Sequence, residues 1–219
     1  MLSPTFLFDS EERWFPIAVE ESLSKFGYEW HGGAGTWLDK NKQPVSHLNF
    51  PAKMTQPDLK PVGYRRVIHR VNLYWHQYWL WYLYNPKNFV GSGQHEGDWE
   101  FVQLGCTDPE GSQPVLVTGS QHHTGVKREF WRTEQANGSF NVYVALGSHA
   151  NYLSSMKDLE DRADGKGKAL HQIEWRAFGP WAMWAGRWGN SRGVGKSPES
   201  PGLQSTRWNT PHIFHGQSR

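Results

Sequence analysis

The stretch Leu73-Tyr-Trp-His-Gln-Tyr-Trp-Leu-Trp-Tyr-Leu-Tyr84 decides the fold of this chain. Aromatic and β-branched side chains dominate the region from Val67 to Tyr84, which predicts a long β-strand. Because successive side chains of a strand point to opposite faces, the tryptophans at odd positions share one face and the tyrosines at even positions share the other. Both faces are bulky and apolar, as in a central strand between two packed layers.

Shorter strands follow along the chain. Alternating and β-branched patterns predict strands over residues 98–104, 115–118 and 140–146, with turns rich in glycine and proline between them. The pair Asn137-Gly138 predicts a hairpin turn that joins a strand beginning at Phe130 to the strand at 140–146. This pattern indicates an all-β fold: a single β-sandwich domain over residues 1–219, with long loops and a few short helices.

Composition narrows the class of protein. The chain has 219 residues with 15% aromatic residues, which indicates a folded core rather than a disordered chain. Its 23 Lys and Arg nearly balance 21 Asp and Glu, so we expect no nucleic-acid partner. The single cysteine, Cys106, excludes an internal disulfide.

The sequence also bears on localisation. No run approaches the ~18 apolar residues of a membrane-spanning helix. The first residues include acidic side chains and lack the basic stretch with which a signal peptide begins. We therefore do not predict a signal peptide in these residues. We therefore expect a cytoplasmic or otherwise soluble intracellular protein.

The stretch Gln94-His-Glu-Gly-Asp-Trp-Glu100 concentrates groups that can do chemistry. Asp98 and Glu100 share one face of a predicted strand, and that face continues through residues expected in the core. Unpaired buried carboxylates cost several kcal/mol, so they need a cationic partner. A divalent cation held by Asp98, Glu100, the amide oxygen of Asn88 and the imidazole of His95 satisfies this need.

The identity of the cation follows from these ligands. Oxygen ligands favour calcium, magnesium or manganese, and the imidazole also admits zinc. An ion pair with an arginine is the alternative, and Arg65, Arg66 and Arg187 are its candidates.

Two further polar clusters follow predicted strands. Gln121-His122-His123 comes after the strand at 115–118, and Ser148-His149 comes after the strand at 140–146. We predict that these strand ends converge with the acid pair in one site. His122 and His149 are then the predicted catalytic acid or base, together with Asp98 and Glu100.

The same site needs residues that contact a substrate. We assign this role to Gln121, His123, Tyr82 and Trp99, which lie on or beside the same predicted strands. The aromatic strand would contribute an aromatic lining to a pocket at the end of the sandwich.

Parts of the chain resemble the vacuolar-protein-sorting-62-like family. The segments that carry the resemblance are Trp81-Tyr-Leu-Tyr-Asn-Pro-Lys-Asn88, Gln94-His-Glu-Gly-Asp-Trp-Glu100 and Gly147-Ser-His-Ala-Asn-Tyr152. Shorter matches lie at Glu12-Arg-Trp-Phe-Pro16, Ser120-Gln-His122 and Gly186-Arg-Trp-Gly189, so the resemblance spans nearly the whole chain. It implies a β-sandwich.

The same central run is more distantly similar to the necrosis- and ethylene-inducing-peptide-like (NLP) toxins, whose hallmark is Gly-His-Arg-His-Asp-Trp-Glu. That family implies a β-sandwich that holds a divalent cation and binds sphingolipid sugar headgroups at membranes. Carried over by position, its cation ligands fall on Asn88, His95, Asp98 and Glu100. The chain departs from the toxins with asparagine at 88, Glu96 in place of arginine and Gly97 in place of the second histidine.

Three interpretations of the cluster remain open. The first is a metal-dependent hydrolase or lyase that acts on a small polar or aromatic-containing substrate, or its metal-free form with a carboxylate pair. The second is a non-catalytic, cation-dependent protein that binds a glycan or a lipid headgroup, with peripheral contact to a membrane. The third is a purely structural polar network. We favour the enzyme on sequence, because several titratable groups are predicted to converge.

Overall fold

The computed structural model describes residues 2–51, 55–86, 94–121, 124–136, 138–157, 161–190 and 197–214. The longer strands are β1 (Pro4–Phe8), β4 (Val62–Arg70), β5 (Leu73–Asn85), β6 (His95–Cys106), β7 (Pro114–Gln121), β8 (Thr124–Glu129) and β10 (Ser139–Val144). The short strands are β2 (Glu29–His31), β3 (Thr36–Leu38), β9 (Gln135–Ala136), β11 (Asn151–Tyr152), β12 (Met156–Lys157), β13 (Arg162–Ala163), β14 (Ala169–Leu170) and β15 (Glu174–Arg176). The helices are α1 (Val19–Ser24) and α2 (Ser205–Trp208), with 3₁₀ turns η1 (Phe130–Arg132), η2 (Pro180–Met183), η3 (Pro201–Leu203) and η4 (Pro211–Ile213).

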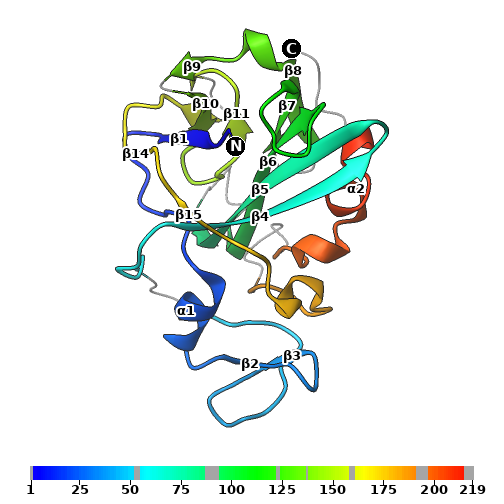
Figure 1. Ribbon diagram of the computed structural model, residues 1–219. Coiled ribbons are helices and arrows are strands. Elements are labelled where there is room, and N and C mark those ends of the chain that lie inside the picture. The colour runs from blue at the N-terminus through cyan, green and yellow to red at the C-terminus, as the bar shows by residue number, and fades with distance from the viewer. Residues whose placement is uncertain are drawn as a thin grey trace.

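The larger sheet has six strands in the order β15-β4-β5-β6-β7-β8. Strands β4 to β8 form an antiparallel meander, and β15 joins its edge in parallel to β4 (Figure 1). The aromatic strand β5 lies in the interior of this sheet, as its two bulky faces predict. It pairs with β6 along most of its length, from Tyr74 opposite Cys106 to Asn85 opposite His95.

The smaller sheet has the order β11-β10-β1-β14, and β9 pairs with β10 beside it. Its central pair, β1 and β10, is parallel although the two strands lie far apart in sequence. Sequence patterns within either strand carry no information on this pairing. The two sheets confirm the predicted all-β, sandwich-like fold.

Two hydrophobic cores lie on opposite faces of the six-stranded sheet. The core between the sheets contains Tyr78, Leu80 and Val102 from the large sheet, packed with Phe6 and Val142 from the small one. The second core contains α1, η2 and the neighbouring loops, and its largest fully buried members are tryptophans at positions 37, 79, 81, 99, 181 and 188. Each such indole removes ~150–250 Å² of surface from water, so this layer contributes strongly to stability.

The register of β5 and β6 determines where the acid pair lies. Asp98 is opposite Tyr82, and Glu100 is opposite Leu80. Both carboxylates therefore face the core between the two sheets, while Trp99 faces the tryptophan-rich core. Asp98 and Glu100 are 6% and 3% exposed. The prediction that they share a buried face is confirmed.

Two strand predictions are wrong. The one long strand predicted over residues 67–84 is divided into β4 and β5 by a turn at Val71 and Asn72, where φ is positive at both residues. The strand predicted to begin at Phe130 is also wrong. Phe130 begins the 3₁₀ turn η1, and the strand that pairs with β10 is the two-residue β9. Trp131 in η1 is 66% exposed, so the aromatic residues of this segment do not reflect a buried strand. Asn137 of the predicted turn lies outside the described residues.

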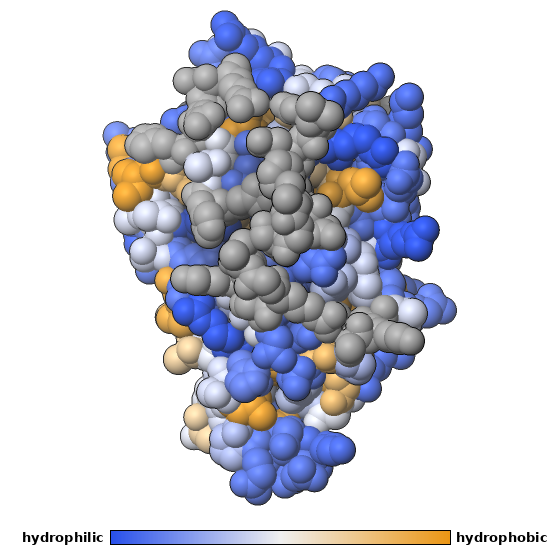
Figure 2. Space-filling model, turned by 180° about the vertical axis from the view of Figure 1, so that it is seen from behind, coloured by the Kyte–Doolittle hydropathy of each residue, from blue (hydrophilic) through white to orange (hydrophobic). Residues whose placement is uncertain are grey.

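The described surface is mostly polar. On the coloured part of the face in Figure 2, hydrophobic side chains form separate patches among hydrophilic ones. Among the helices of the described ranges, none is long and apolar enough to cross a membrane.

Gly97 allows β6 to pass close to the C-terminal part of the chain. Its φ is +69°, and an added Cβ would lie 1.8 Å from the carbonyl oxygen of Trp188. We expect Gly97→Ala to lower the free energy of unfolding by roughly 3 kcal/mol or more, because the clash is with backbone. Gly35→Ala is the matched control, since Gly35 has φ +62° with nothing within 4 Å of the added Cβ.

The control should lose only about 1–2 kcal/mol, the cost of a side chain at positive φ. Urea unfolding of both variants measures the difference. Equal losses would show that Gly97 is constrained by its backbone angle and not by the contact with Trp188.

Candidate functional site

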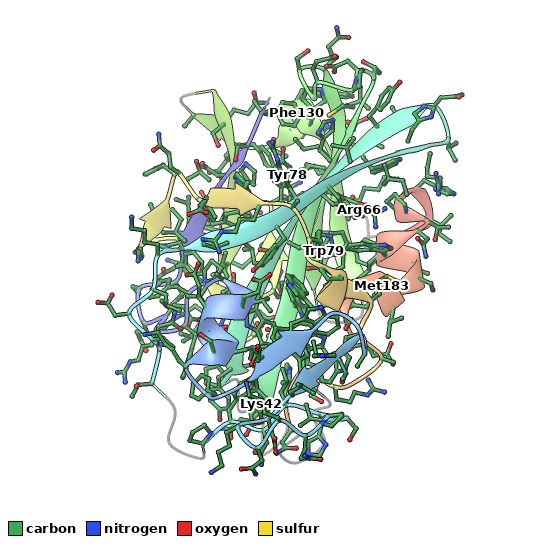
Figure 3. All side chains as sticks on the ribbon, turned by 60° about the horizontal axis from the view of Figure 1, so that its bottom comes forward. Lys42, Arg66, Tyr78, Trp79, Phe130 and Met183 are labelled. Atoms are coloured by element: carbon green, nitrogen blue, oxygen red, sulfur yellow. The ribbon has the colours of Figure 1, made fainter. Side chains whose placement is uncertain are left out.

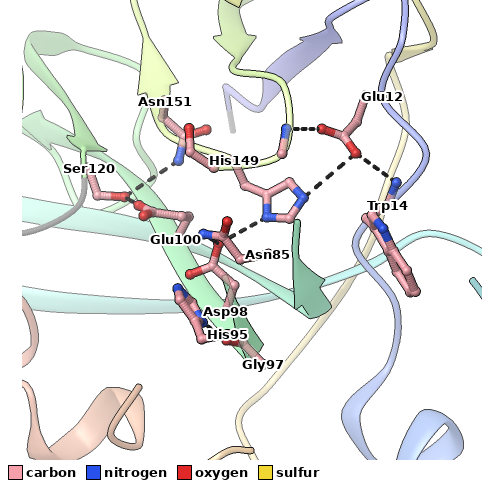
Figure 4. Close-up of polar contacts among 12 residues, drawn as sticks. Glu12, Trp14, Asn85, His95, Gly97, Asp98, Glu100, Ser120, His149 and Asn151 are labelled. Atoms are coloured by element: carbon pink, nitrogen blue, oxygen red, sulfur yellow. Dashed lines mark hydrogen bonds and ion pairs between the residues drawn. The ribbon is translucent and has the colours of Figure 1, made fainter. Parts of the chain in front are cut away.

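His149 forms the centre of the site and lies in the turn that follows β10. Its side chain is fully buried, and its Nδ1 donates a hydrogen bond to Oδ2 of Asp98 at 2.9 Å (Figure 4). Asn85 at the end of β5 donates a second hydrogen bond to the same oxygen at 3.3 Å. The structure thus brings together Asp98 and His149, as predicted.

Glu12 lies on the other side of His149. Its Oε1 is 3.8 Å from Nε2 of His149, which is an ion-pair distance but too long for a hydrogen bond. The carboxylate also accepts backbone hydrogen bonds from Arg13, Trp14 and Gly147. His149 is therefore held between two buried carboxylates.

Tyr82 completes the environment of His149. The two rings are parallel, with an interplanar angle of 1° and centroids 3.9 Å apart. The Tyr82 hydroxyl is buried and has no hydrogen-bond partner among the described residues. Burial, together with the nearby carboxylates, raises the pKa of this hydroxyl well above its ordinary value. His149 itself has a φ of +54°, a backbone region that costs a non-glycine residue about 1–2 kcal/mol.

The two carboxylates determine the charge of His149. Burial alone would lower its pKa, but Asp98 and Glu12 on its two sides raise the pKa to about 9. Burial likewise favours the neutral form of Glu12, while His149 and the backbone N–H donors lower its pKa to about 2. These directions favour a buried imidazolium at His149 and an ionised carboxylate at Glu12 at neutral pH.

Glu100 belongs to a second, adjoining network. The Ser120 hydroxyl at the end of β7 donates a hydrogen bond to Oε2 of Glu100. The same hydroxyl oxygen accepts a hydrogen bond from the backbone N–H of Phe101 at 2.8 Å. The Asn151 side-chain amide approaches it at 3.5 Å. These contacts fix the carboxylate that lies two residues along the strand from Asp98.

The arginines predicted as alternative partners lie elsewhere. Arg187 pairs with Glu199 at 3.1 Å, and Arg65 and Arg66 lie on β4. The cationic partner of Asp98 is His149 instead. The charges of Glu100 and Asp98 also act on Arg207. Burial lowers the pKa of the Arg207 guanidinium, and these two charges partly offset that lowering.

His95 is partly buried at the start of β6. Its Nδ1 lies 2.7 Å from the carbonyl oxygen of Gly97. A carbonyl oxygen only accepts hydrogen bonds, so Nδ1 carries the proton and Nε2 holds the lone pair. Histidines that bind metals are commonly oriented in this way.

The remaining predicted residues are dispersed. Trp99 lies on the opposite face of the sheet from Asp98, so the structure does not bring these two side chains together. Gln121 ends β7, and its amide approaches the carbonyl oxygen of Asn151 at 3.5 Å. Asn88, His122 and His123 lie outside the described residues.

The carboxylate oxygens of this site supply some of the ligands that a hard divalent cation requires. Asp98 and Glu100 offer carboxylate oxygens, and Oδ1 of Asp98 accepts no hydrogen bond within the described ranges. In the part of the chain that the structure describes, no three His, Cys, Asp or Glu side chains form a metal-binding group. Magnesium is often held by only one or two carboxylates plus water, so the acid pair is compatible with such an ion.

The sequence alone missed three members of the site. Glu12 lies at ion-pair distance from His149, Asn85 donates a hydrogen bond to Asp98, and Ser120 donates one to Glu100. All three stand within the segments that carry the family resemblance, which is the signal that could have identified them. Their roles depend on contacts between residues up to 137 positions apart, which spacing does not encode.

Glu12 gives a pH-dependent prediction. A pKa of about 2 in the folded state, against 4.5 ordinarily, corresponds to about 3 kcal/mol of stability. This contribution is present above pH 4.5 and is lost as the pH falls toward 2, because the unfolded chain binds the proton more tightly. We expect Glu12→Gln to lower the free energy of unfolding by roughly this amount at pH 7. Between pH 5 and 2, the free energy of unfolding of this variant should fall less steeply than that of the unchanged protein.

Denaturant unfolding across this pH range measures the effect. Glu11→Gln is the matched control, because the Glu11 side chain is 68% exposed and pairs only at the surface with Arg162. A control that loses as much stability as Glu12→Gln would contradict the assignment.

Comparisons with known proteins identify the fold. No family model matches the chain, and no curated protein matches it. The resemblance to the vacuolar-protein-sorting-62-like family therefore gains no support.

Solved structures do match. A structure described as NLPPya in complex with glucosamine has a TM-score of 0.50 and 13% identity, covering 93% of this chain and 83% of its own. NLPPya in complex with mannosamine has the same TM-score and coverage with 12% identity. Necrosis and Ethylene inducing Protein 2 from the causal agent of cocoa's Witches Broom disease has a TM-score of 0.46 and 14% identity, covering 80% and 70%. The chain therefore has the fold of the NLP toxins.

Proposed function

We propose that this protein binds a sugar headgroup of the amino-sugar class near the start of β6. The acid pair Asp98 and Glu100 forms the floor of this site and also holds a divalent cation. The sugar could be free, part of a glycan or carried by a lipid, since its amine and hydroxyl groups are the same in each case. This proposal corresponds to the second interpretation of the sequence, a non-catalytic, cation-dependent protein that binds a glycan or a lipid headgroup.

The position of Asp98 is the observation that carries this proposal. One carboxylate oxygen, Oδ2, is fixed by His149 and Asn85, which leaves Oδ1 as an oriented acceptor. A carboxylate in this state can pair with the ammonium of an amino sugar or coordinate a cation. A fixed acceptor loses little conformational entropy when a ligand binds.

A bound cation would add affinity for sugar hydroxyls. Calcium or magnesium coordinates hydroxyl oxygens in place of water, so it would join the acid pair to the hydroxyl groups of the sugar. Asp98 and Glu100 would hold this ion. His149 compensates part of the negative charge of the pair and keeps Asp98 oriented.

Binding is favoured over catalysis by the state of His149. Its ring is fully buried, engaged by Asp98 and stacked on Tyr82, so it does not reach a ligand at the surface. A general base also works best with a pKa near the ambient pH, and the pKa of His149 is raised to about 9. The metal-dependent hydrolase or lyase stays a prediction, since His122 lies outside the described residues.

The similar structures support the choice of ligand. Two structures of one protein with the same fold, NLPPya, are described as its complexes with glucosamine and with mannosamine. At such low sequence identity the likeness to this chain is one of fold alone. The ligand class is our inference, and it agrees with the chemistry of the acid pair, which can bind an ammonium group.

We expect the purified protein to bind glucosamine and mannosamine more tightly than glucose and mannose, and calcium or magnesium to strengthen binding. Isothermal titration with each sugar, in EDTA and with each ion added back, measures this. Asp98→Asn keeps the shape of the side chain but removes its charge, so it should weaken amino-sugar binding by roughly tenfold or more.

Glu110→Gln removes one exposed acidic charge outside the site and serves as the control. It should bind as the unchanged protein does. Equal affinity for amino sugars and neutral sugars, or full binding by a folded Asp98→Asn variant, would refute the proposal. Thermal melts of each variant establish that it is folded.

A further inference from the structure

Strand β4 forms part of an open edge of the six-stranded sheet. Strand β15 covers this edge only along Val62–Tyr64. Beyond Tyr64, residues 65–70 pair with β5 on one side, and no described backbone–backbone hydrogen bond reaches their other side. The carbonyl oxygens of His69 and Arg70 accept side-chain hydrogen bonds from Arg70 and Trp75. An uncovered edge offers unpaired backbone N–H and C=O groups to another strand.

The uncovered segment, residues 65–70, is strongly basic, and we call it the basic edge. Its sequence is Arg-Arg-Val-Ile-His-Arg, with no acidic residue. Arg65, His69 and Arg70 are exposed. Val67 is also 45% exposed, so the edge combines positive charge with a small apolar contact.

Alternation places two arginines on one face of the basic edge, beside α2. The guanidinium of Arg66 lies 3.9 Å from the centroid of the Trp208 ring (Figure 3). Arg70 donates hydrogen bonds from Nε to the carbonyl oxygen of Asn209 at 3.2 Å and from Nη1 to that of His69 at 2.8 Å. Both side chains are therefore held in place before any ligand arrives, which lowers the entropic cost of binding.

The positive charge of these two arginines is not neutralised within the described ranges. Neither Arg66 nor Arg70 forms an ion pair there, and Nη1 of Arg66 is buried without a hydrogen-bond partner. Burial and the charge of Arg70 lower the pKa of Arg66 to about 10, so Arg66 remains cationic at neutral pH. An acidic partner would relieve this repulsion.

We propose that the basic edge binds an extended acidic segment of another protein, which adds to the sheet as a strand beside β4. Backbone hydrogen bonds would supply affinity, and acidic side chains on the α2 side would pair with Arg66 and Arg70. Alternate apolar side chains of the segment would contact Val67 on the opposite face. A second copy of this chain does not fit, because two basic edges repel each other.

This surface is independent of the sugar site. The β4–β5 hairpin turn precedes Leu73, whereas the acid pair lies opposite Tyr82 and Leu80, farther along β5. Arg70 lies opposite Leu73, nine residues or about 30 Å along β5 from Tyr82, and Arg66 lies opposite Gln77, five residues or about 16 Å from it at ~3.3 Å per residue. Variants at one surface should leave the other unchanged.

The test uses a capped eight-residue peptide of alternating glutamate and valine, titrated into the intact protein. We expect binding that protects the backbone amides of residues 65–70 from hydrogen exchange. Arg66→Gln combined with Arg70→Gln should weaken it by roughly tenfold or more, since two charge-assisted contacts are lost. Lys42→Gln combined with Arg132→Gln removes the same charge at exposed sites elsewhere and should have little effect.

Two peptide controls separate strand addition from general charge attraction. The same peptide with N-methylated backbone at alternate positions cannot pair as a strand and should not bind, and a lysine–valine peptide should not bind either. Absence of binding by the acidic peptide would overturn the proposal and leave the arginines as protection against aggregation. Equal binding of the N-methylated peptide, or full competition by inorganic phosphate or duplex DNA at similar charge concentration, would also overturn it.

Discussion

The imidazolium of His149 between the carboxylates of Asp98 and Glu12 is the interaction on which the end of this sandwich depends. Asp98 belongs to the six-stranded sheet, whereas His149 follows β10 and Glu12 follows β1, both strands of the smaller sheet. The three charges therefore join the two sheets. Removing one partner from a buried ion pair leaves an uncompensated charge, at a cost of roughly 3–5 kcal/mol.

Packing of aromatic side chains, rather than ion pairing, holds the opposite face of β6. Trp81 and Trp99 pack tightly with Trp188, which holds the strand by dispersion and hydrophobic burial. The buried carboxylate of Glu96 adds hydrogen bonds from the backbone N–H groups of Phe50 and Asn190. Because the backbone of β6 is held on this side, the carboxylates on its other side keep a defined direction, which a binding site requires.

Much of the fold and part of the site could be predicted from sequence. The two apolar faces of the aromatic strand predicted a central β5, and alternation placed Asp98 and Glu100 on one buried face. The segment at Phe130 was mispredicted because its aromatic residues suit a strand but lie in an exposed turn. The catalytic role predicted for His149 stays a prediction, and the structure adds that its imidazole is buried between the carboxylates of Asp98 and Glu12.

The basic edge and the proposed sugar site lie on different strands of the large sheet, β4 and β6. The sequence by itself determined the strand pattern, the parity of each side chain and the local density of acids or arginines, because these follow from neighbours along the chain. Only the tertiary structure decided which strands pair in parallel, that Glu12 faces His149, and that β15 leaves β4 uncovered beyond Tyr64. These contacts join segments more than a hundred residues apart, and packing of the whole chain selects them.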